Sequence, residues 1–528
     1  MEDTIQADYD SLQGEREPYL KRARECAALT IPTLIQETPF TKDSRLIEPY
    51  QNIGSDGISG LSGRLTTTLF PAGLTFYRLN PSAKMKADPD ITPDGLEAVA
   101  NFLYMRELLV KSLLDGTNFR TKMRVAIQYL LVAGNSLIKI DDDYQLRVFH
   151  PESYVQTRDH TYSVTKVITK ECIDPLSLPA KMRAVAMQDV KDEDSDEDLD
   201  LYTRIVWNRT AKGKLDGSVR ITQECNGHII NESREAVSPY FVAGYDELTG
   251  GHYSRSFAEL KLGSLRSTNS LAQSMLEGAA AVSKLLAVYD ATKRAKARDL
   301  TLPSGSVVEG SVENGVAQGY GLVTTQKSAD LNVAHSFYTN LQTVLARSMM
   351  LEAASQPTGE RVTATQIGRI AAELEGALGG VYAQIAEELQ RPFLMRVLWQ
   401  MKRDKLYPVA SSEFEKEVEL QVLTGIEALG RQQELDKLLA GIQTLAQFPG
   451  GLDRLKMQVV AMRVLTRLGI DISGLLKSDA ELEKERQAAI QQQNQLAMGQ
   501  EAAKAAGNVA TEVASQYASA QAQPTSAG

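Results

Sequence analysis

Residues 363–394 read TATQIGRIAAELEGALGGVYAQIAEELQRPFL, and they carry an unusually long helical pattern. Thr363 and Gln366 have the spacing of a capping box, which marks the start of a helix. Apolar residues then recur every three or four positions, at Ile367, Ile370, Leu374, Leu378, Val381, Ile385 and Leu389. The sequence predicts one very long helix, kinked at Pro392, whose apolar stripe needs neighbours and so points to oligomerisation.

Two helices precede this one and enclose a small insert. The first runs from 254 to about 286, and the second from about 331 to 350. The second helix places several apolar residues on one face, namely Phe337, Leu341, Val344, Leu345 and Met349. Residues 287–328 between the two helices are rich in glycine and contain short β-like runs. This order predicts a hairpin-shaped stalk with a small β tip, followed by a polar loop at 353–361.

The first half of the chain combines helices with short strands. Helical patterns fall at 15–29, 51–70, 94–114 and 118–133. From Ser136 to about Asn231 the pattern changes to short runs of β-branched and aromatic residues separated by turn residues. We therefore expect a helix-rich α+β fold with a β-meander in its middle.

The C-terminal part returns to helical patterns at 430–447, 453–468 and 479–505. Alanine and glutamine dominate the chain after residue 480. Such a composition offers few large apolar side chains to offset the entropy lost on ordering. We expect a helix that passes into a disordered tail over 501–528.

The charge balance is acidic, with 67 aspartates and glutamates against 57 lysines and arginines, for a net charge of −10. A protein that grips nucleic acid through phosphate contacts usually presents a basic face. The acidic balance therefore argues against a tight DNA-binding protein. The acidic balance is compatible with a protein past which DNA slides without binding tightly.

Motifs of enzymes and metal sites are missing from the sequence. There is no phosphate-binding loop, no His-Glu-x-x-His and no Gly-x-Ser-x-Gly, and the five histidines and three cysteines are scattered. The acidic run at 189–200 begins like a calcium loop, but Glu197 and Thr203 occupy the positions that need glycine and glutamate. The sequence predicts a protein that is not an enzyme and has no cofactor or metal site.

Two features allow more than one interpretation. The basic cluster Lys293, Arg294, Lys296 and Arg298 interrupts an otherwise acidic chain. It is either a set of phosphate contacts, a docking surface for an acidic partner, or an exposed helix end whose cations complement the helix dipole. The loop at 356–361 is either a plain connector between helices or a mobile functional loop.

Several collinear blocks give the chain a family resemblance. They are Tyr19 with Thr30-Ile31-Pro32, Leu69-Phe70-Pro71, Leu131-Val132-Ala133-Gly134-Asn135, Ser254-Arg255-Ser256, Thr358-Gly359-Glu360-Arg361-Val362-Thr363-Ala364, Glu373-Leu374-Glu375, Leu378-Gly379-Gly380-Val381-Tyr382, and Thr424-Gly425-Ile426-Glu427-Ala428-Leu429-Gly430-Arg431 with Leu435-Asp436-Lys437-Leu438. In this order the chain resembles the head-to-tail connector, or portal, proteins of short-tailed bacteriophages. The match covers most of the chain and is weaker at 160–240 and 287–328.

The resemblance implies a fold with four named regions, which assembles into a cyclic ring around a central channel. Residues 1–253 and 362–425 would form the wing, with a helical N-terminus followed by the β-meander. The stem helices would be 254–286 and 329–352, and the clip would be the insert at 287–328. The tunnel loop would be 353–361, and the helical crown would be 426–500.

The resemblance also implies a function and a set of partners. A ring of about twelve subunits would sit at one capsid vertex of the virion, after assembly in the host cytoplasm. Double-stranded DNA would enter through its channel during packaging and leave during ejection. The implied protein partners are the terminase motor, capsid and scaffolding proteins, tail or adaptor proteins and internal core proteins. No membrane is implied.

Candidate site residues follow from the same resemblance. Arg347 and Arg361 would form rings of cations that keep the duplex centred in the channel. Glu360 would be an opposing acid, and Gly359, beside Thr358, would be the pivot of a loop that retains DNA after filling. The cluster Lys293, Arg294, Lys296 and Arg298 would be exposed on the clip, near the motor or tail interface.

Two other functions stay open at this point. The helix-rich second half and the expected disordered tail would fit a helical scaffolding or internal virion protein, but the β-rich middle would not. A DNA-packaging enzyme would need the phosphate-binding loop that the sequence lacks.

Overall fold

The computed structural model describes residues 4–36, 48–72, 75–88, 91–188, 198–210, 215–248, 250–283, 286–289, 311–313, 316–318, 320–323, 328–351, 364–407, 418–422, 440–445 and 447. The chain divides into two units, residues 1–432 and 433–528. In the second unit the described residues 440–445 are helical. The helices expected at 453–505 and the tail lie outside the described residues.

Helices dominate the N-terminal part, and their bounds are α1 (Ile5–Ala28), α2 (Ile53–Leu69), α3 (Ala83–Ala87), α4 (Pro93–Asp115), α5 (Phe119–Ala133) and α6 (Ala180–Ala186). The first helix begins ten residues before the predicted start, because the Thr4 hydroxyl accepts a hydrogen bond from the Ala7 amide and caps it. Pro18 lies inside α1 without ending it. Helix α5 ends where predicted, at Gly134 in the left-handed conformation.

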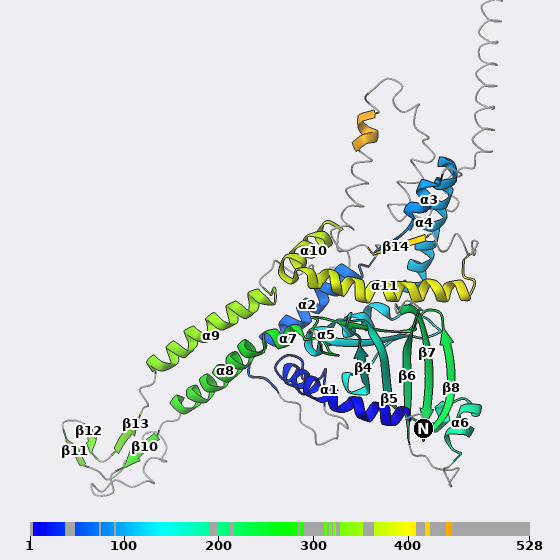
Figure 1. Cartoon of the computed structure of the whole chain (residues 1–528). Coiled ribbons are helices and arrows are strands. Elements are labelled where there is room, and N and C mark those ends of the chain that lie inside the picture. The colour runs from blue at the N-terminus through cyan, green and yellow to red at the C-terminus, as the bar shows by residue number, and fades with distance from the viewer. Residues whose placement is uncertain are drawn as a thin grey trace, which may run out of the picture. The chain divides into compact units, whose positions relative to one another are not determined.

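The β-meander is confirmed as a five-stranded antiparallel sheet in which each strand pairs with its sequence neighbour. Its strands are β4 (Tyr154–Arg158), β5 (Val164–Ile173), β6 (Leu199–Arg209), β7 (Leu215–Cys225) and β8 (His228–Glu235). Helix α1 lies along this sheet (Figure 1), where Lys166 of β5 donates to both carboxylate oxygens of Asp8 at 2.8 and 2.9 Å. A separate sheet of order β3-β2-β9 combines β2 (Asn135–Ile140), β3 (Leu146–Val148) and β9 (Tyr240–Gly244).

The main core gathers around α5 and a long helix near the end of the first unit. Helix α5 is buried along most of its length, and Phe119 at its start stacks on Phe393 with ring centroids 5.7 Å apart. Phe70 and Phe76 meet the same cluster edge to face, with ring centroids 5.2 Å apart. Residues more than 300 positions apart therefore share one apolar core, which joins the N-terminal helices to α11 (Gly380–Arg403).

The predicted hairpin is present, with small changes. Its first arm is divided into α7 (Phe257–Leu260) and α8 (Leu262–Ser283), and its second arm is α9 (Ser328–Ser348). The two arms lie side by side (Figure 1), and between them the described residues form β10 (Leu286–Tyr289), β11 (Ser311–Glu313), β12 (Val316–Gln318) and β13 (Tyr320–Val323). Strands β10 and β13 pair with each other, as do β11 and β12.

The prediction of one very long helix kinked at Pro392 was wrong. The segment forms two helices, α10 (Ala364–Leu378) and α11 (Gly380–Arg403). The break falls at Gly379, whose φ of +58° few other residues adopt, while Pro392 lies inside α11 without ending it. Beyond α11, strand β14 (Val418–Val422) pairs antiparallel with β1 (Tyr77–Pro81). Thr363, the predicted cap, lies outside the described residues.

The break at Gly379 leads to a stability prediction. Gly379→Ala should destabilise the fold by about 1–3 kcal/mol, because alanine is strained at this backbone conformation. Gly380→Ala is the matched control, since a Cβ at either position meets nothing within 4 Å and Gly380 has no positive φ. Chemical denaturation monitored by circular dichroism measures both changes. Equal effects of the two substitutions would contradict the assigned break.

Candidate functional site

The point at which the hairpin leaves the body of the fold is built from two of the blocks singled out in the sequence. A Cβ on Gly134 would lie within 2.4 Å of the Ser254 carbonyl oxygen, so only glycine allows this close approach. Asn135 donates from its side chain to the Ser254 carbonyl at 3.2 Å and accepts from the Ser254 amide at 3.1 Å. The start of the hairpin is therefore fixed to the end of α5.

Charged pairs tie the first arm to α1. The Ser256 hydroxyl accepts from the Glu259 amide and caps α7. Glu259 lies 3.3 Å from Arg22 of α1 and 3.4 Å from Arg255. Seven residues further along the chain, Arg266 of α8 pairs with Glu25 of α1 at 2.5 Å. These contacts orient α8 relative to the N-terminal helix.

The second arm is anchored to α2. Met349 is buried at the end of α9 and packs so closely on Gly57 that a Cβ there would overlap its side chain. Arg64 of α2 donates to the Met350 carbonyl at 2.7 Å, and Met350 itself has a φ of +59° just after the helix ends. Both arms of the hairpin are thus held by the body of the fold, and the chain leaves α9 at a defined place.

Arg347 is the one predicted channel residue that lies in the described part of the chain. It is exposed in the last turn of α9, where its charge complements the helix dipole. Charged residues are rare along the two arms, since α8 contains Arg266 and Glu277, and α9 contains Asp330 and Arg347. Serine, threonine, asparagine and glutamine occupy most of the other polar positions.

The predicted single apolar face of α9 is divided in the structure. Leu345 and Met349 are buried against the body, whereas Phe337 and Val344 are 62% and 56% exposed. The division arises because the end of α9 packs on α2, with Leu345 and Met349 toward the body. Val344 lies on the other side of the helix, and Phe337 lies earlier in it, so both are left uncovered in a single chain. The remaining predicted site residues, Thr358, Gly359, Glu360 and Arg361, and the cluster Lys293, Arg294, Lys296 and Arg298, lie outside the described residues.

A carboxylate that the sequence did not single out links α11 to the base of the hairpin. Glu388 accepts a hydrogen bond from the Gly244 amide at 2.6 Å and one from Gln384 at 3.0 Å. Burial raises the pKa of Glu388, and these hydrogen bonds oppose that shift. One acid among the 67 of the chain carried no signal in the sequence, because its importance depends on the end of β9 lying beside it.

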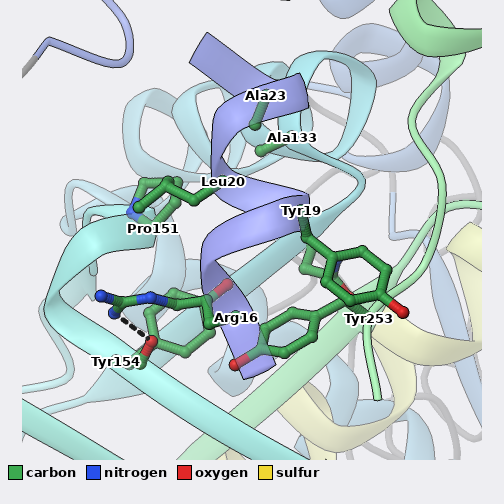
Figure 2. Close-up of a pocket in the computed structure, with 9 residues that line it drawn as sticks. Arg16, Tyr19, Leu20, Ala23, Ala133, Pro151, Tyr154 and Tyr253 are labelled. Carbon is green, nitrogen blue, oxygen red and sulfur yellow. Dashed lines mark hydrogen bonds between the residues drawn. The ribbon is translucent and has the colours of Figure 1, made fainter. Parts of the chain in front are cut away.

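Figure 2 shows a small cavity beside α1 that sequence reasoning also missed. Arg16 is 4% exposed, and its guanidinium donates to the carbonyls of Glu152 at 2.6 Å and Tyr154 at 2.9 Å. The cavity measures about 20 Å³, close to the space that one water molecule needs. It is a feature of packing between α1 and β4 and is too small for an organic ligand.

The described residues contain no group of three or more histidine, cysteine or acidic side chains placed to hold a metal ion. Burial raises the pKa of Cys26 to about 12, which makes that thiol a poor nucleophile. Among the described helices, none is both long and apolar enough to cross a bilayer.

Comparisons with known proteins identify the family. A model of the family "Bacteriophage head to tail connecting protein" matches residues 2–476. The portal protein of Enterobacteria phage T3 is 30% identical over 91% of this chain and 89% of its own length. The portal protein of Escherichia phage T7 is 30% identical over 92% and 90%, and that of Enterobacteria phage SP6 is 27% identical over 81% of each.

The chain belongs to the family of bacteriophage head to tail connecting proteins, the portal proteins. These are structural components of the phage particle and not enzymes. A chain from the "Neck of empty GTA particle computed with C6 symmetry" aligns over 76% of this chain with a TM-score of 0.35 and 11% identity, which is too distant to support an argument here.

The raised pKa of Glu388 predicts a pH-dependent stability. The Glu388 carboxyl binds a proton more tightly in the folded chain than in the unfolded chain. The protonated carboxyl therefore stabilises the fold below about pH 4.5, and this contribution is lost as pH rises through the raised pKa. Glu388→Gln keeps an acceptor for the Gly244 amide and removes the charge, so it should be at least as stable as the parent at pH 8. Denaturation midpoints between pH 4 and 8 measure this.

Glu387→Gln is the matched control, because Glu387 is exposed on the same helix and pairs with Arg391. Its substitution should leave the pH dependence of the parent unchanged. A Glu388→Gln protein that is less stable than the parent at pH 8 would show that the carboxylate charge stabilises this contact, contrary to the stated sign.

Proposed function

We propose that this chain forms the portal of a short-tailed phage, a closed ring through which double-stranded DNA enters the capsid and later leaves it. The observation that carries the proposal is the hairpin of α8 and α9, anchored at both ends and poor in charge, in a chain of the portal family. A wall of uncharged polar side chains gives a duplex few phosphate contacts to hold it.

The regions of the chain take the roles that the family resemblance implies. The wing would comprise residues 1–253 and 362–425, and the stem would comprise 254–286 and 329–352. The clip would be 287–328, the tunnel loop 353–361 and the crown 426–500. In a ring, the exposed apolar side chains of α9 would find neighbours in adjacent subunits, which is a further reason to favour a cyclic assembly over a monomer.

Charge at a few positions would then act on DNA. One arginine in each subunit becomes a ring of cations, whose combined field acts on the duplex. Arg347 and Arg361 would supply such rings, with Glu360 opposing them, Gly359 as pivot and Thr358 beside it. The cluster at 293–298 would face the terminase during packaging and tail proteins afterwards, while other surfaces would meet capsid, scaffolding and core proteins.

Electron microscopy of the purified protein in negative stain, combined with native mass spectrometry, tests the ring. Rings with a central hole as wide as a duplex and a mass near twelve copies of the 57.9 kDa chain, about 0.7 MDa, are expected. A uniform monomer or dimer without a hole would contradict the portal function and favour a scaffolding protein. The packaging enzyme is tested by nucleotide hydrolysis, which should be absent.

The tunnel-loop assignment makes a separate prediction. Arg361→Ala should leave ring formation unchanged and reduce the fraction of packaged DNA retained in filled heads, because one ring of cations is lost. Retention is measured by nuclease protection after packaging. Arg369→Ala is the control, since Arg369 is exposed on α10 and pairs with Glu373. Failure of the Arg361→Ala protein to form rings would contradict a gating role.

A further inference from the structure

A groove that no part of the proposed DNA path uses runs between α11 and β14, which lie side by side (Figure 1). It encloses about 990 Å³. Its lining comes from five elements and one loop residue: Leu79, Asn80, Lys86, Arg106, Arg391, Met395, Leu398, Trp399, Lys402, Tyr407 and residues 418–421. Four consecutive residues of β14 line the groove, although successive side chains of a strand point to opposite faces. The groove therefore follows the edge of the strand.

The outer edge of β14 has unused backbone groups. The Leu79 amide of β1 donates to the Glu107 carboxylate at 2.6 Å, so it points away from β14. Leu79 is directly opposite Leu420, and residues of such a pair in an antiparallel ladder have the same orientation. The Leu420 amide and carbonyl consequently point outward. In the described part of the chain, β1 and β14 form a sheet of two strands, and no third strand covers this edge.

The rim of the groove carries lysine side chains, and its lining combines apolar with polar residues. Lys86 is exposed and Lys402 half-buried, and neither has an ion-pair partner among the described residues. Met395, on the exposed side of α11, is 46% exposed, and Trp399 lies one turn further along the same wall. A basic rim is notable in a chain with a net charge of −10. It complements a partner that carries acidic side chains beside an apolar one.

We propose that this groove binds an extended, acidic peptide segment of a partner protein, which adds to β14 as a third strand. The backbone of the segment would pair with the outward groups of Leu420. Its carboxylates would lie near Lys86 and Lys402, and an apolar side chain would rest on Met395 and Trp399. DNA fits less well, because a duplex has no strand backbone that could pair with Leu420. The proposal does not rest on ring formation or on DNA transport.

Fluorescence anisotropy with the full-length protein tests the groove. The probe is a fluorescein-labelled peptide of sequence Glu-Val-Glu-Phe-Glu-Val-Glu, which should bind in a salt-dependent manner. The double variant Lys86→Gln/Lys402→Gln should bind the peptide about tenfold more weakly, because each lysine contributes a modest charge contact and the two contributions add. Lys122→Gln is the control, because Lys122 is exposed on α5, away from the groove lining. The same peptide with alternate backbone nitrogens methylated should lose binding, because strand pairing needs its amides.

Several results would overturn the proposal. The groove is not a peptide site if the acidic peptide fails to bind, or if the double lysine variant binds it as tightly as the parent does. Equal binding of the methylated peptide would exclude strand addition. A 20-base-pair duplex that binds more tightly than the peptide and loses affinity in the double variant would make the groove a nucleic-acid surface. If the parent does not bind the peptide and the double variant changes the native mass, the groove is a contact between copies of this chain.

Discussion

The close approach of two backbone segments at Gly134 is the constraint on which much of the described fold depends. A side chain at this position would collide with the carbonyl of Ser254. The end of α5 and the start of the hairpin can therefore come this close only because residue 134 is glycine. The Asn135 side chain then satisfies the amide and carbonyl of Ser254, which would otherwise be buried without partners. From this point β2 pairs with β9, and α7 and α8 begin in a defined direction.

Helix α11 contacts both the core of the N-terminal helices and the β-sheets. Phe393 packs into the aromatic cluster of the N-terminal helices, while Glu388 holds the end of β9. Further along, Arg396 pairs with Glu235 of the five-stranded sheet at 3.1 Å, and Gln400 donates to carbonyls in the loop after β2. Helix α11 thus contacts the core and both larger sheets, and it also lines the groove beside β14. Buried polar contacts of this kind fix the position of the helix more narrowly than apolar packing alone.

The distribution of charge fits a structural protein whose surfaces serve different partners. Acidic residues outnumber basic ones in the chain, yet the two hairpin arms carry few charges of either sign. Basic side chains concentrate instead at places such as the groove rim near α11. Under the two proposals, one surface would let a polyanion pass while another would attract an acidic protein segment, since charge contacts act over about a Debye length of 8–10 Å.

The amino-acid sequence by itself determined the helix-rich α+β class, the order of the segments, the meander and the family, because periodicity, turn residues and collinear blocks are local properties. It did not determine where the long helical pattern breaks: Pro392 carries the stronger local signal, but the chain turns at Gly379, where the backbone adopts a positive φ. Only the tertiary structure brought Gly134 to Ser254, Glu388 to Gly244 and β14 to α11. The first two of these contacts join residues more than 100 positions apart, and no local pattern encodes which distant backbone group a buried side chain will meet.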